Sequence, residues 1–287
     1  MKLFRKVREL DGHRKIYFLG VRVLSYRQSV KPRDYSYEIL KYLGATHCAN
    51  LRNLVLGSSH GRDAFVPGTY DFNLSASSLD LYRIWHLYKY VVEHNGKNLR
   101  NVIIVWSVFH PGLQLEKTIE WKNCIPYKKL YGIDYAFPLP VDDTFVLNAI
   151  DEQLPNIVCP KTFRGKSLYT TNHETPTEIL VEKHLKNTKR NNNQIQYLEN
   201  IVRFARRHKH NVFVVLPPYR SDYLSYLPGN DVVYRELFEF LKHNPDVKLF
   251  DFQYDSDFVD SDFDSPDHCN EAGGKKLTRK LRAAMRK

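Results

Sequence analysis

The chain has 287 residues, of which 43% are hydrophobic, 26% charged and 13% aromatic, and its formal net charge is +11. This length and composition predict one large globular domain or two small ones, and they exclude a disordered or collagen-like chain. The sequence contains no apolar run of about 18 residues and no apolar signal core, so we expect neither a membrane span nor a secretory signal. Four widely spaced cysteines predict reduced thiols of a cytoplasmic protein, not a disulfide framework or a zinc site.

The positive charge is concentrated at the two ends of the chain. Residues 1–33 contain ten lysines and arginines against two acidic residues, and residues 270–287 contain seven against one, so the middle of the chain is net negative. Basic ends suit an anionic membrane face, at about 1 kcal/mol per Lys or Arg, or an acidic partner or glycan; plain solubility is the simpler interpretation. No nucleic-acid partner is expected, because the chain lacks zinc-finger spacing, an RNP-like strand and a GxxG clamp.

The first half of the chain alternates apolar runs with one long helical pattern. In chain order it predicts a hairpin (or one buried strand) over 15–27, strands over 53–56 and 71–74, a helix opening at 77–78 and ending near 96, and a strand over 101–108. The apolar run over 53–56 is followed by Gly57. It is typical of a buried parallel strand that leads into a loop.

The second half begins with a Pro-rich and aromatic stretch, residues 111–175, which we interpret as an insertion that could cover a site. It then predicts a helix over 177–209 with a break at 191–193, a strand over 211–216, a helix over 232–241, a strand over 247–250 and a helix over 270–286. Strands that alternate with helices predict βαβ units and a mostly parallel sheet. We therefore predict a single α/β domain, with a basic N-terminal segment and one insertion.

Two polar segments stand at the same predicted edge of this sheet. The sequence GSSHG (Gly57–Gly61) follows the first strand, and DSPDHCN (Asp264–Asn270) lies between the last strand and the last helix. In open α/β sheets ligands bind at the carboxyl ends of the strands. A serine and an acid–histidine pair that meet there have the groups that nucleophilic catalysis needs, because the histidine takes the hydroxyl proton and a carboxylate orients the histidine.

Each of these residues also has a simpler interpretation. Ser59 could cap the following helix, and His268 could lie beside a cap formed by Asn270. His60 is expected in the wall of the site, and His208 and His210 at a solvated helix end.

The aspartates of the C-terminal region form a second polar feature. Seven of them lie between Asp251 and Asp267, without the glycine and closing glutamate of a calcium loop, so we expect them to be mostly solvated and expect no metal. The triplets at 255–257 and 260–262 fit the DxD pattern of glycosyltransferases, which is a weak signal in so acidic a stretch.

The GSSHG turn, the segment FNLSASSLDLY (72–82) and the segment DSPDHCNEAGGKKLT (264–278) resemble the SGNH (GDSL-like) esterase and acyltransferase superfamily in order and spacing. The resemblance implies a flavodoxin-like three-layer α/β/α fold. It implies Ser59 as the nucleophile, with Ser58 where many members have Asp, and His268 as the general base. The family acid stands three residues before the histidine, where this chain has Ser265. Asp264 is the favoured substitute, since adjacent residues normally point apart, and Asp267 is the second candidate.

The resemblance also implies an oxyanion hole. It would combine the Ser59 N–H with a backbone N–H of the loop Asn73–Ser77, so that Gly57, Ser58, His60, Asn73, Ser75 and Ser77 line the site. The usual third donor, an asparagine after the third strand, is replaced by Phe109. Ser107 or His110 could supply that donor instead, or the third donor could be missing.

The segment KIYFLGVRVLSYR (15–27) is similar to a short segment of bacterial surface-polysaccharide glycosyltransferases and their neighbours, which implies work on a glycan. We therefore expect a carbohydrate O-acetyltransferase with acetyl-CoA as the acyl donor and no bound cofactor. We expect it in the cytoplasm, with peripheral contact to the inner membrane face or to a biosynthetic complex through its basic ends. The alternatives are an esterase with the same site, a non-catalytic binder of a glycan or partner, and a glycosyltransferase.

Overall fold

A computed structural model describes residues 3–8, 13–27, 33–140, 142–167, 175–188 and 193–286. The chain groups into two compact units. Unit 1 comprises Met1–Tyr42 and Gln114–Val158, and unit 2 comprises Leu43–Leu113 and Cys159–Lys287. This division is finer than the single domain with an insertion that the sequence predicts, because most of the insertion groups with the N-terminal segment.

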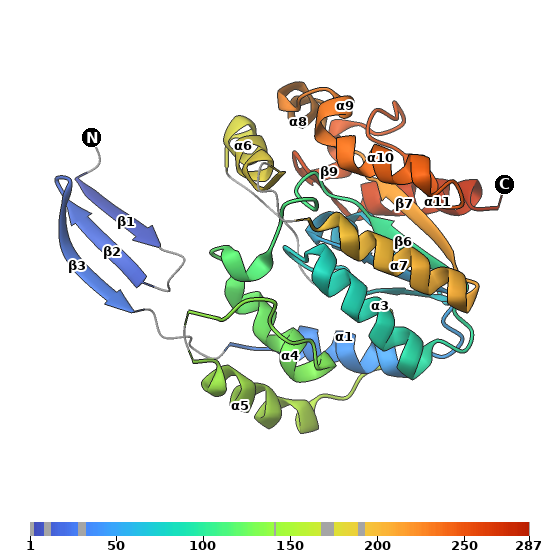
Figure 1. The fold of residues 1–287 in the computed structure, drawn as a ribbon, viewed down its shortest axis with the longest axis horizontal. Coiled ribbons are helices and arrows are strands. Elements are labelled where there is room, and N and C mark those ends of the chain that lie inside the picture. Colours follow the sequence, from blue (N-terminus) through green and yellow to red (C-terminus); the bar gives the residue numbers. More distant parts are fainter. Residues whose placement is uncertain are drawn as a thin grey trace. The chain divides into compact units, whose positions relative to one another are not determined.

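Unit 2 is built around a parallel sheet (Figure 1). Its five strands are β4 (Asn53–Gly57), β5 (Asp71–Asn73), β6 (Asn101–Val105), β7 (Asn211–Leu216) and β8 (Lys248–Asp251), in the order β5-β4-β6-β7-β8. This is the strand order of flavodoxin-like doubly wound folds, in which ligands bind where the order reverses. The predicted α/β class is confirmed, and the reversal places the ends of β4 and β6 side by side.

Helices cover both faces of this sheet. The helices of unit 2 are α2 (Ser59–Ala64), α3 (Leu81–Asn95), α6 (Thr177–Thr188), α7 (Ile195–His208), α8 (Ser221–Tyr226), α9 (Asn230–Val233), α10 (Arg235–His243), α11 (Glu271–Ala284) and the short 3-10 helix η4 (Asp260–Asp262). Strand side chains alternate between the two faces. Val55 and Val105 join the buried cluster formed with α2 and α11, whereas α3 and α7 pack together on the opposite face (Figure 1).

Two boundaries in unit 2 differ from the prediction by three residues or more. Helix α3 begins at Leu81, because Asp80 caps it by accepting the Arg83 N–H at 3.0 Å, and Ser78 has a φ of 55°, which a helix does not allow. Strand β6 ends at Val105, three residues early, because the following segment turns. The expected helix break at 191–193 falls mostly on residues outside the described ranges.

The C-terminal segment carries the second polar motif. Strands β9 (Phe263–Ser265) and β10 (His268–Cys269) form a small antiparallel pair. Asn270 then caps α11, since its side-chain oxygen accepts the N–H groups of Ala272 and Gly273 at 2.9 and 3.1 Å. The predicted cap is confirmed, and it holds His268 immediately before the helix.

Unit 1 contains the N-terminal sheet. Strands β1 (Phe4–Arg8), β2 (His13–Phe18) and β3 (Val21–Arg27) are antiparallel, so the predicted hairpin gains one more strand. The remaining elements of unit 1 are η1 (Leu115–Lys117), η2 (Trp121–Cys124), α4 (Ile125–Tyr131), α5 (Thr144–Gln153) and η3 (Leu154–Asn156); α1 (Ser36–His47) spans the boundary of the units. The sequence pattern missed these helices.

Within the described ranges, no helix combines the length and the apolar character that a bilayer crossing requires. All four cysteines are free thiols, as expected, and Cys48, Cys124 and Cys269 are buried.

Candidate active site

The two polar segments meet at the carboxyl edge of the sheet in unit 2. His60, the second residue of α2, and His268 of β10 have ring centroids 4.9 Å apart, and α2 packs against β10. His60 and Asp267, which are 207 positions apart in the sequence, also form a hydrogen bond with each other. The fold therefore brings the turn after β4 to the acid–histidine pair, as the sequence predicts.

Ser58 and Ser59 have different environments. Ser58 is fully buried and caps α2: its Oγ accepts the His60 N–H at 3.3 Å and lies 2.5 Å from the Ser107 Oγ. Ser59 begins the helix and is half-buried, and its hydroxyl makes no hydrogen bond within the described part of the chain. The helix cap is thus Ser58, which leaves Ser59 available for chemistry.

Gly57 sets the tightness of this turn. It is the last residue of β4 and pairs with Val105 of β6. A Cβ at position 57 would lie 2.6 Å from the Val105 carbonyl oxygen, which is closer than real Cβ contacts come. A glycine is therefore needed where β4 passes β6 and delivers the two serines to the sheet edge.

The acid beside His268 is Asp267. Its Oδ1 lies 2.9 Å from the His268 Nδ1, and the Ser265 Oγ lies 3.0 Å from both atoms. The favoured candidate, Asp264, makes no hydrogen bond to His268, although both residues are described. Asp267 lies in the turn between β9 and β10, where neighbouring side chains do not alternate as they do in a strand, so adjacent side chains can contact each other there.

This arrangement determines the tautomer of His268. An ionised carboxylate only accepts hydrogen bonds, so the His268 Nδ1 donates to Asp267. The other ring nitrogen, Nε2, then carries the lone pair that accepts a proton in general-base catalysis. The Ser265 hydroxyl, at the position of the family acid, donates to the same carboxylate oxygen.

His60 is more than a wall residue. Its Nε2 lies 3.0 Å from the Asp267 Oδ2, and its Nδ1 lies 3.3 Å from the Tyr219 hydroxyl. Burial is the main cause that lowers the pKa of His60, so the ring stays neutral. The His60 side chain therefore contacts the acid of the site directly.

Three further residues of this cluster were not anticipated. Tyr219 follows β7, and His184 of α6 has its Nδ1 2.8 Å from the Tyr223 hydroxyl and its Nε2 3.9 Å from the Asp267 Oδ2. Burial lowers the pKa of His184 to about 3. The position of Tyr219 just after a strand end, and the helical spacing of His184 from the buried Leu180, were the signals that the sequence offered.

Most backbone N–H groups of the predicted oxyanion loop, Asn73–Ser77, already donate hydrogen bonds within the protein. The N–H groups of residues 73, 74, 75 and 76 donate to the Arg164 carbonyl, the Val55 carbonyl, the Asn73 Oδ1 and the Gly57 carbonyl. The Asn73 amide donates to the carbonyls of Gly61 and Phe65, so Asn73 and Ser75 hold the loop and α2 together. The Ser77 Oγ accepts a hydrogen bond from Arg62. The backbone N–H of Ser77 takes no part in the loop hydrogen bonds described above.

The two residues predicted as substitutes for the third donor, Ser107 and His110, take part in other hydrogen bonds. Ser107 and His110 are fully buried, and the Ser107 N–H donates to the His110 Nδ1 at 3.1 Å. The Ser107 hydroxyl is engaged with Ser58. Phe109 instead lies against the cluster, with its ring centroid 5.5 Å from that of His60 and 5.1 Å from that of His184. The segment after β6 therefore supplies an apolar wall.

The buried His110 makes the free energy of unfolding depend on pH. Burial lowers its pKa to about 3, whereas an unfolded histidine titrates near 6.5. Below about pH 6.5 only the unfolded chain takes up this proton, so the free energy of unfolding falls as the pH falls toward about 3. At about 1.4 kcal/mol per pH unit, the loss from His110 between pH 7 and pH 5 is about 2 kcal/mol.

Urea unfolding at the two pH values measures this loss. His110→Asn keeps an acceptor for the Ser107 N–H but does not titrate, so we expect its stability to fall by about 2 kcal/mol less than that of the wild type over the same interval. Equal losses in the two proteins would contradict the assignment.

Most aspartates of the acidic stretch are at least partly exposed, as predicted, but several of them are paired with basic residues of the C-terminal helix. Asp262 is buried and pairs with Lys276, and Lys280 pairs with Asp255 and Asp257. Arg282 pairs with Asp71. The basic C-terminal helix is thus partly neutralised inside unit 2, and three aspartates of the DxD triplets, Asp255, Asp257 and Asp262, are paired with lysines.

One group of described side chains has a geometry open to metal binding. Ligand atoms of His60, Asp267 and His268 all lie within 4.8 Å of one another, and the three residues are buried. These are the side chains of the acid–histidine cluster, so a metal there would compete with its hydrogen bonds.

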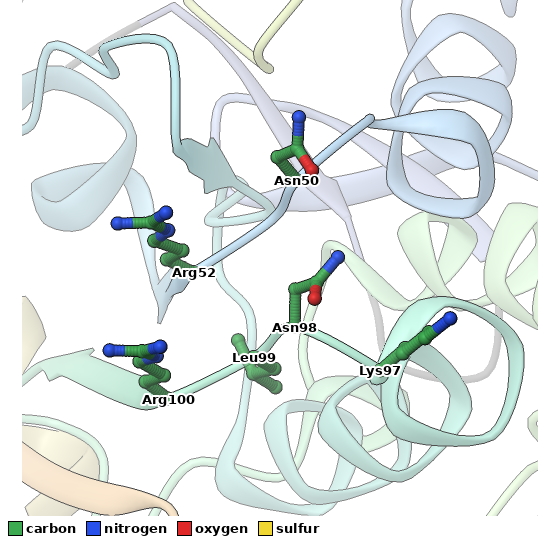
Figure 2. Close-up of a pocket in the computed structure, with 6 residues that line it drawn as sticks. All are labelled: Asn50, Arg52, Lys97, Asn98, Leu99 and Arg100. Atoms are coloured by element: carbon green, nitrogen blue, oxygen red, sulfur yellow. The ribbon is translucent and has the colours of Figure 1, made fainter.

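A basic pocket lies at the other edge of the sheet. It has a volume of about 160 Å³ and is lined by Asn50, Arg52, Lys97, Asn98, Leu99 and Arg100 (Figure 2). Arg52 and Arg100 precede β4 and β6, and Figure 2 shows their side chains extending to the same side. Because the candidate nucleophile follows the far ends of these strands, this pocket is separate from the active-site cluster.

Comparison with known proteins adds no relative: no protein-family model matches the chain, and no curated protein matches it significantly. The assignment of a function therefore depends on the geometry of the site.

Proposed function

We propose that the protein is a serine-dependent O-acyltransferase that transfers an acetyl group from acetyl-CoA to a hydroxyl of a carbohydrate. The observation that carries this proposal is the Asp267–His268 pair, hydrogen-bonded at 2.9 Å and buried beside the helix that begins with Ser59. A histidine in this tautomer activates a hydroxyl that is otherwise a poor nucleophile.

The reaction would proceed in two steps. The Ser59 Oγ attacks the thioester carbon, its proton moves to the His268 Nε2, and the C–S bond breaks as the coenzyme A sulfur leaves with that proton. A sugar hydroxyl then attacks the acetyl–serine ester and gives its proton to His268, and the bond between the acetyl carbon and the Ser59 Oγ breaks as His268 returns that proton to the Oγ. Water in place of the sugar makes the same site an esterase.

Direct detection of the acyl-enzyme tests this proposal. Incubation with acetyl-CoA is expected to add one acetyl group to the intact protein, and peptide mass spectrometry is expected to locate it on Ser59. The same mixture with acceptor sugars should regenerate the free enzyme. An adduct on another residue, or none with either acetyl-CoA or an activated acetyl ester, would refute it and favour the non-catalytic binder.

The glycosyltransferase alternative is less well supported. Its DxD acids would need to bind a metal and a sugar nucleotide, but Asp255 and Asp257 pair with Lys280. A thermal-shift comparison separates the two, because a donor at 100 times its dissociation constant adds about 2.7 kcal/mol of stability. We expect acetyl-CoA, and not sugar nucleotides, to stabilise the protein.

The proposal includes peripheral contact with an anionic membrane through the N-terminal sheet. Phe18 and Val21 face each other across β2 and β3 and are 37% and 68% exposed, and Arg22 beside them is also exposed. Exposed apolar groups together with basic residues favour binding at a lipid surface.

Vesicle sedimentation measures this contact. The double variant Phe18→Ser, Val21→Ser is expected to bind anionic vesicles about tenfold more weakly than the wild type, because each side chain loses apolar burial in the lipid. Val158→Ser, at an 86% exposed position, is the matched control and should bind as the wild type does. Equal binding by the double variant would exclude the sheet as the contact.

A further inference from the structure

The carboxylate of Asp267 lies between two imidazoles. Its Oδ1 is 2.9 Å from the His268 Nδ1, and its Oδ2 is 3.0 Å from the His60 Nε2. Asp267 is 2% exposed. Burial acts to raise the pKa of this carboxyl, but His268 and His60 outweigh it and hold the pKa well below the ordinary value. The group is therefore an ionised acceptor with one imidazole on each oxygen.

The hydrogen-bond directions around His60 follow from this charge. An ionised carboxylate cannot donate, so the His60 Nε2 carries the proton. A neutral ring has a single N–H, which makes the His60 Nδ1 an acceptor, and the Tyr219 hydroxyl 3.3 Å away is its donor. Burial raises the pKa of Tyr219 well above its usual value, so this hydroxyl keeps its proton. Tyr219 thus supports, together with Asp267, the tautomer in which His60 donates to Asp267.

The surroundings leave His60 little freedom to turn. Its ring lies 5.5 Å from Phe109, 5.7 Å from His184 and 5.4 Å from Tyr219, measured between ring centroids. The titratable groups that face the pair come from several segments: Asp63 of α2, His184 of α6, Tyr219 after β7, Tyr223 of α8 and His268 of β10. Most of them are buried and neutral. His60 adds a hydrogen-bond donor from outside the β9–β10 turn to the two donors, Ser265 and His268, that Asp267 has within it.

We propose that His60 is a positioning residue: through its hydrogen bond to the Oδ2 it holds the Asp267 carboxylate in the orientation in which the Oδ1 accepts from His268. This inference rests on the proposed function in treating His268 as the catalytic base. It differs from the expectation that His60 only lines the site, because it gives the histidine of the GSSHG turn a direct part in orienting the base.

Loss of the His60 donor should let the carboxylate rotate and should release the His268 ring. In His60→Phe the ring volume is kept but the N–H is lost, and we expect kcat/KM for ester hydrolysis to fall about 100-fold, as small misplacements of catalytic groups do. His60→Gln places an amide N–H near the former Nε2 and should recover most of this loss. Tyr219→Phe, which removes the hydroxyl that supports this tautomer, should cause a smaller decrease.

The decisive readout is the tautomer of His268, measured by nitrogen NMR of the imidazoles in the full chain. Wild type and His60→Gln should show a single tautomer with the proton on Nδ1, and His60→Phe a mixture. This measurement needs no turnover, so it remains informative if no acyl-enzyme forms on Ser59. If His60→Phe does not fold, the comparison of wild type with Tyr219→Phe decides the question in the same way.

Three results would overturn the proposal. The first is an unchanged His268 tautomer and unchanged kcat/KM in His60→Phe. The second is an equal loss in His60→Gln and His60→Phe, which would indicate packing alone. The third concerns metal binding, since His60, Asp267 and His268 lie close enough to share an ion: activity of the wild type that is lost with a chelator and restored by Zn²⁺ would make these residues metal ligands instead.

Discussion

Ser59→Ala is expected to abolish covalent labelling of the protein by a serine-reactive fluorophosphonate. Ser59 is half-buried at the start of α2, one residue before His60 of the acid–histidine cluster, and its hydroxyl is not used as the helix cap. Ser58, which is the cap, is fully buried and bound to Ser107. A single reactive serine is therefore expected, and its removal leaves the reagent no nucleophile in the site.

The histidine and a distant serine complete this experiment. His268→Gln should slow labelling by a factor on the order of 10³, because a general base contributes about 10² to 10⁴ to such reactions. Ser225→Ala removes an exposed hydroxyl that donates to the Asp222 carbonyl and should label at the wild-type rate. Persistent labelling of Ser59→Ala at full extent would refute the enzyme assignment.

Asp267→Asn is expected to reduce kcat/KM for ester hydrolysis by about 10³- to 10⁴-fold, with little change in KM. The asparagine amide keeps the shape of the carboxylate but loses its charge, and it can present an N–H to the His268 Nδ1, which favours the wrong tautomer. It also changes the group that accepts the hydrogen bond from the His60 Nε2. The substitution therefore affects both imidazoles at once.

Asp264→Asn is the matched control, since it makes the same chemical change three residues away. Asp264 has no hydrogen bond to His268, so its replacement should change kcat/KM by less than about twofold. If Asp264→Asn had the large effect and Asp267→Asn the small one, the contacts in the β9–β10 turn would not describe the working site.

The class of fold and the location of the site follow closely from local sequence patterns. Short apolar runs such as 53–56 and 211–216 predict buried strands because a parallel sheet is covered on both faces. A polar motif after such a strand is placed at the carboxyl edge by the chain direction alone. The sequence alone therefore predicts that the GSSHG turn and the DSPDHCN segment lie at the same edge of the sheet.

The sequence does not predict which charged residues of the C-terminal region form ion pairs. The basic residues 270–287 look like an exposed end, and the preceding aspartates look solvated. In the folded chain Lys276 and Lys280 of α11 pair with aspartates of the same stretch, because the helix packs back along it. Counting charges along the chain does not reveal such pairs, since they depend on which surfaces meet.

The sequence by itself determined the α/β class, the helix cap at Asn270 and the residue types that could carry acyl transfer, because each depends on a few neighbouring residues. The tertiary structure decided that Asp267, and not Asp264, is hydrogen-bonded to His268 and to His60, and it added His184 and Tyr219 to the predicted cluster. Position along the chain could not choose between Asp264 and Asp267, because a turn breaks the alternation of side chains, and contacts between segments about 200 residues apart exist only once the sheet has assembled.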